Sequence, residues 1–290
     1  MATVSLQLII GGILQGGIYA LAAFGLSLIF GVSNILNLAH GEFLMLGAMV
    51  SFLVYTGTEL SPFVTALGLI PLFFAVGSLF ERGLIRPLSG RPDHMRLVAS
   101  ILVTLGASIA IEDFASFAFG PNEKALAYTL PSFQVGPIIV STIRLAGLAF
   151  ILVLTLALHT FLKRTYQGRA IVATTQSRRG AMLVGVNIQR VANLSFGIGA
   201  ILAALAGVFF VIMFPVTPYV GLPLTLKYLC IIVLGGLGSL FGTLLGGLVL
   251  GLVEILVAYY SPHWSETSAF IILVLILLIR PQGLFGRFSG

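Results

Sequence analysis

The stretch from Lys163 to Arg190 reads KRTYQGRAIVATTQSRRGAMLVGVNIQR and lies between two long hydrophobic runs. It contains six Lys or Arg residues and no Asp or Glu. Ser177 is placed to cap a short helix over residues 178–184, which Gly185 would end, and Asn187 is placed to cap the next helix. A basic loop between two membrane spans is typical of the cytoplasmic side, whereas a short helix with apolar tips is typical of a docking site. Composition alone leaves both interpretations open.

The composition of the whole chain predicts an all-α integral membrane protein. The chain has 290 residues, of which 58% are hydrophobic and 8% are charged, and its mean hydropathy is +1.11. Soluble domains carry about 25% charged residues. The net charge of +6 resides mainly in loops, which indicates membrane orientation and not nucleic-acid binding. Residues 1–41 contain no charged side chain, so the first span lacks the positive region of a signal peptide and is expected to stay in the mature protein.

Polar residues interrupt the apolar pattern where the second span begins. The first span, about 6–30, is rich in small residues that let helices approach closely. Asn37, His40 and Glu42 then lie at the start of a segment that continues to about residue 55. Polar groups at membrane depth are costly and are kept for a function or a structural lock. We therefore expect a lock, a contact with the transported solute, or a contact with another subunit.

Five further spans are predicted at about 60–80, 97–119, 145–162, 191–213 and 269–279. The apolar stretch 225–260 is too long for one span and is broken in its middle by Gly235, Gly236, Gly238 and Gly242. We predict a broken helical hairpin there. Its glycines serve either tight packing or a translocation path. Glu254 on the second limb needs a partner, and we expect no unpaired Lys or Arg deep in a span, which favours a zwitterionic or neutral solute.

The distribution of basic residues predicts the orientation. The loops 81–96 and 163–190 contain four and six Lys or Arg residues, and the C-terminal tail contains two. These segments are expected in the cytoplasm. The N-terminus is then outside and the C-terminus is cytoplasmic, with about eight transmembrane helices, or nine if both limbs of the hairpin cross fully.

No motif for catalysis is present in the sequence. It contains no phosphate-binding G-x-x-x-x-G-K-[ST] loop, no H-E-x-x-H metal motif and no G-x-S-x-G nucleophile elbow. We therefore expect no enzymatic activity, no cofactor and no metal site, and we expect a transporter or a channel.

Several short motifs, in order along nearly the whole chain, resemble the membrane permeases of branched-chain amino acid ABC importers. They are Asn37-Leu-Ala-His-Gly-Glu42, Glu81-Arg-x-x-x-Arg86-Pro-Leu88, Gly168-Arg-Ala170, Gly185-Val-Asn187-x-x-Arg190-Val, Leu234-Gly-Gly-Leu-Gly-Ser239 and Arg280-Pro-x-Gly283-Leu-Phe-Gly286. The order and the short C-terminus are more similar to the "H" permease of the pair than to its longer companion. At residues 176–179 the chain has Gln-Ser-Arg-Arg, where these permeases commonly carry an acidic pair. Urea and amide permeases also vary at this place.

The resemblance implies one permease domain over residues 1–290 in the bacterial inner membrane, with 163–190 as a cytoplasmic coupling loop. Its implied partners are a second permease, two cytoplasmic ATP-binding subunits and a periplasmic solute-binding protein. The residues implied in coupling are Gly168, Arg169, Ala173, Ser177, Arg178, Arg179, Gly180, Ala181, Met182, Leu183 and Gly185.

The residues expected to line the translocation path are Asn37, His40, Glu42, Gly235, Gly236, Gly238 and Ser239. The expected solute is a branched-chain amino acid or a related small amino acid or amide. The alternatives are a passive channel for a small neutral solute such as urea and a proton-coupled carrier that uses Glu42 or Glu254.

Overall fold

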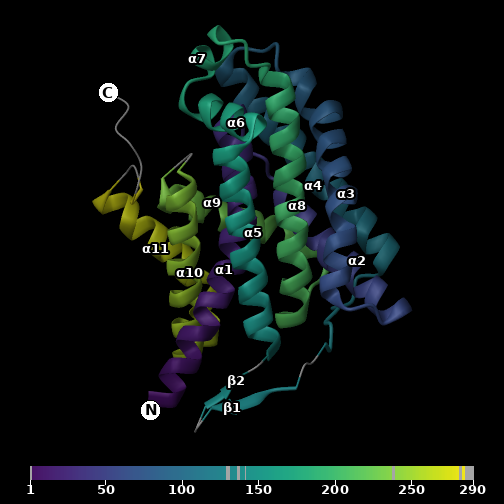
Figure 1. Ribbon diagram of the computed structural model, residues 1–290, viewed down its shortest axis with the longest axis vertical. Helices are drawn as coiled ribbons and strands as arrows, with labels where there is room; N and C mark the ends of the chain where they lie inside the picture. The colour runs from purple at the N-terminus through teal and green to yellow at the C-terminus, as the bar shows by residue number, and fades with distance from the viewer. Residues whose placement is uncertain are drawn as a thin grey trace.

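The computed structural model describes residues 2–128, 131–135, 138–140, 142–236, 239–280 and 283–284. They form a helical bundle (Figure 1), as the sequence predicts. The long helices are α1 (Ala2–Ser33), α2 (His40–Thr58), α3 (Pro62–Phe80), α4 (Asp93–Phe119), α5 (Thr142–Arg164), α8 (Ile188–Met213), α9 (Gly221–Gly235), α10 (Leu240–Tyr260) and α11 (Ser265–Ile279).

Shorter elements connect the long helices. They are the helical turns η1 (Glu81–Ile85), η2 (Arg86–Leu88), η3 (Pro218–Val220) and η4 (Pro262–Trp264), the helices α6 (Tyr166–Gln176) and α7 (Arg178–Leu183), and the strands β1 (Phe133–Val135) and β2 (Ile138–Val140). The strands form a small antiparallel hairpin in the segment between the predicted spans 97–119 and 145–162.

Nine helices among the described residues are long and apolar enough to cross a membrane. Both limbs of the predicted broken hairpin are among them, as α9 and α10, so the higher of the two expected counts agrees with the structure. Helix α9 alone would span about 22 Å at 1.5 Å per residue. The preceding turn η3 extends its apolar segment to Pro218–Gly235, which approaches the thickness of the hydrocarbon core.

Helices α1 and α8 form the centre of the bundle. Within their most apolar windows, 83% and 78% of the residues are buried, against 17%, 22% and 11% for α4, α5 and α11. Helix α1 packs on both α8 and α10 (Figure 1). The outer helices therefore present most of their apolar surface to lipid, and the inner pair holds the fold together.

Close approach of backbones is what joins α1 to α10. A methyl group added to Gly16 would lie 2.7 Å from the Cα of Leu248, and one added to Gly251 would overlap the backbone of Gly16. Such contacts matter in lipid, where no hydrophobic force drives one apolar helix against another. The small residues predicted to pack the first span therefore do so against α10.

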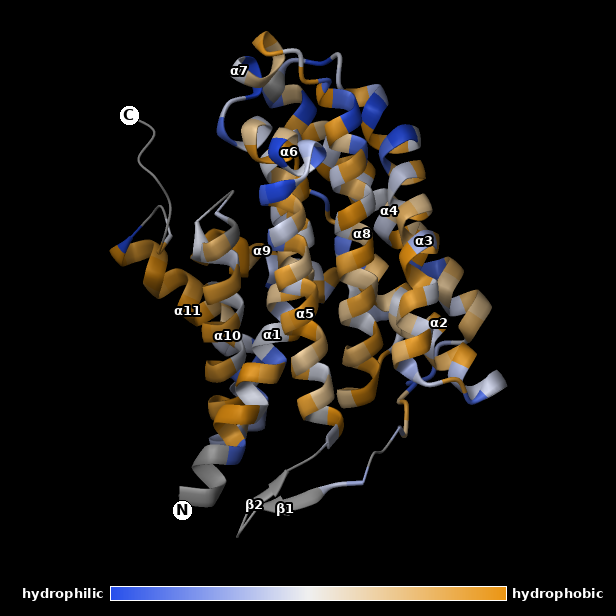
Figure 2. Ribbon diagram, viewed as in Figure 1, coloured by the Kyte–Doolittle hydropathy of each residue, from blue (hydrophilic) through white to orange (hydrophobic). Residues whose placement is uncertain are grey.

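Polar and apolar residues separate along the bundle axis. Figure 2 shows hydrophilic residues gathered at the end that carries α6 and α7, above a largely hydrophobic middle. The basic loop 81–96 lies at the same end, while the β hairpin lies at the opposite end (Figure 1). The two large basic loops thus share one end, which we call the basic end.

We predict that Gly251→Leu destabilises the protein by about 3 kcal/mol or more, because the new side chain overpacks a contact made by backbone atoms. The matched control is Gly68→Leu on α3, since a side chain at Gly68 meets open space. The measurement is the thermal transition and the yield of monodisperse protein in detergent. Equal behaviour of the two variants would contradict this account of packing.

Candidate functional site

Three side-chain caps divide the basic stretch 163–190 into consecutive helices. Thr165 accepts a hydrogen bond from the N–H of Gly168 (2.9 Å) before α6, Ser177 accepts one from Gly180 (3.0 Å) before α7, and Asn187 accepts one from Arg190 (3.0 Å) before α8. The predicted caps at Ser177 and Asn187 are confirmed. Helix α6 is an addition to the prediction, although Thr165 has the residue type and place of an N-cap.

The C-terminus of α7 is closed by a Schellman motif. The N–H of Val186 bonds to the carbonyl of Ala181 and the N–H of Gly185 bonds to Met182, each at 3.0 Å. Gly185 adopts φ +83°, a conformation that glycine permits at no steric cost. The six residues of α7 are therefore held in a defined shape at both ends.

Three consecutive apolar side chains project from this closed turn. Met182, Leu183 and Val184 are 51%, 89% and 76% exposed, whereas Ala181 beside them is buried. We call Met182, Leu183 and Val184 the apolar tip. Large apolar side chains exposed at a polar end of a protein indicate a partner that covers them.

The other predicted coupling residues surround this tip or support it. Gly168 lies against the end of α5 so closely that a side chain there would overlap Phe161 and Leu162. The remaining residues are exposed or half-buried along α6 and α7, namely Arg169, Ala173, Arg178, Arg179 and Gly180. Coupling to a partner stays a prediction for this set.

The polar segment where α2 begins lies in the packed interior. Asn37, His40 and Glu42 each have 0% exposure. The Nε2 atom of His40 lies 2.9 Å from the carbonyl oxygen of Ala22 on α1, and Glu42 accepts a 2.7 Å hydrogen bond from Ser108 on α4.

A backbone hydrogen bond connects this segment to α9, in addition to its contacts with α1 and α4. The N–H of Gly41 donates to Thr225 of α9 (2.7 Å), while the side chain of Asn37 accepts from the N–H of Ala39 (3.2 Å). The segment therefore joins α1, α2, α4 and α9. These contacts fit the structural lock among the expected roles, and a direct contact with solute stays a prediction.

The break between α9 and α10 is a tight turn. Gly235 and Gly242 face each other so closely that a side chain on either would overlap the other's backbone, and Ser239 caps α10 through the N–H of Gly242 (3.1 Å). Gly236 adopts φ +96°. Gly238 and residues 281–282 and 285–290 of the tail lie outside the described residues.

A buried ion pair within the membrane was missed by the sequence analysis. The Nζ of Lys227 on α9 lies 2.6 Å from the Oε1 of Glu254 on α10, and Gln15 of α1 donates to the other carboxylate oxygen at 2.9 Å. The hydroxyl of Tyr19 lies 3.3 Å from Lys227 and 3.0 Å from Gln15. We call these four residues the polar cluster.

The polar cluster meets two expectations. Glu254 has the partner that its position required, and Lys227 is paired with it, so it is not an unpaired charge deep in a span. The lone Lys227 within an apolar run was the available signal.

The polar cluster forms part of the wall of a cavity of about 850 Å³. Apolar side chains from α8, α9 and α11 form much of the rest, including Phe210, Met213, Leu226 and Phe270. Pro215, Pro262 and His263, in the loops opposite the basic end, also line it. A concave, mostly apolar cavity with a few convergent polar groups is the usual form of a small-molecule site.

Comparison with known proteins identifies the family. Residues 8–280 match the family model described as "Branched-chain amino acid transport system / permease component". The LivH permease of the high-affinity branched-chain amino acid transport system of Salmonella typhimurium is 34% identical, with 97% of this chain and 96% of LivH covered.

Further relatives agree with that match. LivH of Escherichia coli K12 is 33% identical and BraD of Pseudomonas aeruginosa is 31% identical, each over 97% of this chain and 96% of the relative. The structure of PsaBC from Streptococcus pneumoniae has a TM-score of 0.48 at 12% identity, covering 95% of this chain and 92% of that chain. From the family model and the LivH and BraD relatives, the chain belongs to the permease components of branched-chain amino acid transport systems.

Proposed function

We propose that the chain is one permease subunit of an ABC importer that moves a branched-chain amino acid across the bacterial inner membrane. The observation that carries this proposal is the apolar tip, which a capped and closed α7 presents at the basic end of the bundle. Together with family membership, it supports a membrane subunit that receives a mechanical input from another protein. The chain itself carries out no chemical step, since ATP hydrolysis takes place on partner subunits.

The partners follow from this role. A second permease completes the translocation path, two cytoplasmic ATP-binding subunits supply the energy, and a periplasmic binding protein delivers the solute. The two large basic loops share one end of the bundle, which supports a cytoplasmic placement of that end. The N-terminus is then outside and the C-terminus is cytoplasmic.

The position of α7 suggests how movement reaches the membrane helices. Helix α7 packs against α6, and α6 packs against α5, α1 and α8. At Gly168 the backbone of α6 meets that of α5 without an intervening side chain. A displacement of the apolar tip by a closing ATPase pair is therefore passed to helices that line the centre of the bundle.

We further propose that the solute passes the polar cluster. A zwitterion presents a carboxylate that Lys227 attracts and an ammonium group that Glu254 attracts, while the apolar wall of the cavity accommodates a branched side chain. Asn37, His40 and Glu42 remain candidates for the path. Because all three are fully buried, the solute is expected to contact the polar cluster in this cavity before it reaches them.

We predict that Leu183→Asp lowers the affinity for the ATP-binding subunit by about thirtyfold and abolishes uptake, because it places a charge at the most exposed apolar position of α7. Folding is unaffected, since the side chain is 89% exposed. The measurement is co-purification of the ATPase with the permease from membranes.

The matched control is Gly90→Asp, which adds the same charge at the same end, where a side chain meets open space. It is expected to retain the ATPase. If Leu183→Asp also retains the ATPase and transports normally, α7 is not the coupling helix.

We predict that Lys227→Met destabilises the protein by about 3–5 kcal/mol, because it leaves the carboxylate of Glu254 buried without its counter-charge. The double variant Lys227→Met/Glu254→Met removes both charges and is expected to regain most of that stability. Thermal unfolding in detergent measures both effects.

Transport by the double variant then separates a structural pair from a solute contact. We expect its KM for a branched-chain amino acid to rise at least about tenfold, equivalent to about 1.4 kcal/mol of lost binding. A folded double variant with an unchanged KM would assign the pair to structure alone.

A further inference from the structure

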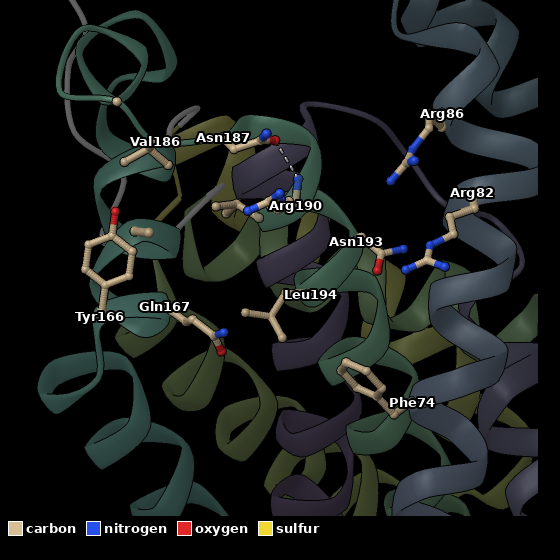
Figure 3. A pocket seen from close by; sticks show the side chains of 13 residues that line it. Phe74, Arg82, Arg86, Tyr166, Gln167, Val186, Asn187, Arg190, Asn193 and Leu194 are labelled. Atoms are coloured by element: carbon tan, nitrogen blue, oxygen red, sulfur yellow. Dashed lines mark hydrogen bonds between the residues drawn. The ribbon is translucent and has the colours of Figure 1, made fainter.

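A second cavity, of about 500 Å³, lies at the basic end between η1 and η2 on one side and α6 and α8 on the other. In Figure 3, Arg82 and Arg86 extend from the α3 side toward Asn193 of α8, and Arg190 lies across from them at the start of α8. Phe74 and Leu194 lie lower in the same view. The cavity therefore has a cationic upper part and an apolar lower part.

The charge of this cavity is strongly one-sided. Three guanidinium groups line it, and no carboxylate is found among its described lining residues. The nearest acid, Glu81, is 3.5 Å from Arg86 and also accepts a 2.9 Å hydrogen bond from Asn193. Within the described part of the chain, the side chains of Arg82 and Arg190 have no carboxylate within ion-pair distance. Two positive charges thus remain uncompensated.

Arg86 offers a further unsatisfied donor. Its Nη2 atom faces Glu81, whereas its Nε atom is buried and has no hydrogen-bond partner among the described residues. A buried donor without a partner is costly. An acceptor bound in the cavity would satisfy it, and a phosphate oxygen suits the planar fork of an arginine.

The depth of the cavity matches the boundary between headgroups and acyl chains. Phe74 precedes Arg82 by eight residues, which is about 12 Å along a helix. Arg82 lies near the end of the apolar segment Pro62–Leu88, and Arg190 lies near the start of Ile188–Met213. The guanidinium groups are therefore at headgroup level and the lower part of the cavity is within the hydrocarbon.

The surface next to the lower part of the cavity is suited to acyl chains. Leu67 and Phe74 lie about two turns apart on the same side of α3, and they are 63% and 38% exposed. A soluble anion would use only the arginines, whereas a phospholipid would use both parts of the cavity. Basic pockets between transmembrane helices are known to recognise anionic lipid headgroups.

From this geometry we propose that the cavity binds an anionic phospholipid. Its phosphate contacts Arg82, Arg86 and Arg190, and its acyl chains run past Phe74 and Leu194 along α3. The site does not depend on which solute the protein moves. It places an ordered lipid against α6, the helix that carries α7.

The test is lipid binding by purified protein, measured by native mass spectrometry and by thermal shift. Delipidated protein is titrated with phosphatidylglycerol and with phosphatidylcholine of identical short acyl chains. We expect phosphatidylglycerol to bind at least tenfold more tightly. Arg82→Gln and Arg190→Gln should each weaken phosphatidylglycerol binding about fivefold, and the double variant about 25-fold, with phosphatidylcholine unaffected.

The matched control is Arg91→Gln, an exposed arginine at the same end that does not line the cavity. It should bind phosphatidylglycerol as the unmodified protein does. Equal binding of the two lipids would overturn the proposal, as would an equal loss in the Arg91→Gln control. A thermal shift with millimolar inorganic phosphate as large as the shift with phosphatidylglycerol would also overturn it, because the site would then recognise a free anion.

Discussion

Close contact between helix backbones is the constraint on which this bundle depends. Lipid tails are as apolar as leucine side chains, so apolar helices gain little by burying one another and must gain by packing closely. Helix α1 does so on two sides, with Gly16 against α10 and Gly25 against the backbone of Gly199 on α8. The lipid-facing helices are then arranged around this central group.

The same contact places the polar cluster. Gln15 directly precedes Gly16, and Glu254 follows Gly251 by three residues, about one turn of helix. Because the two glycines let α1 and α10 meet, the side chains of Gln15 and Glu254 come within 2.9 Å. Lys227 then neutralises the carboxylate from the neighbouring limb of the hairpin. The glycine contact between α1 and α10 thereby places charged side chains in the wall of a cavity inside the membrane.

Much of the fold could be predicted from local sequence, and the candidate site only in part. Apolar runs, the Ser177 and Asn187 caps and the glycine break between α9 and α10 all express local chemistry, and each agrees with the structure. The pair of Lys227 and Glu254 depends on which helices become neighbours, and no local pattern reports that. Helix α6 was missed because it carries no long apolar run. The family match decides for the importer over the passive channel, which composition and motifs had left open.

The central claim is that this chain moves solute only when partner subunits hydrolyse ATP. The most direct measurement is uptake of a radiolabelled branched-chain amino acid by proteoliposomes that contain the complete importer, with the binding protein outside and ATP inside. The account predicts uptake against a gradient that stops when ATP is replaced by a non-hydrolysable analogue. Equal flux with and without hydrolysis would contradict it and would identify a passive channel.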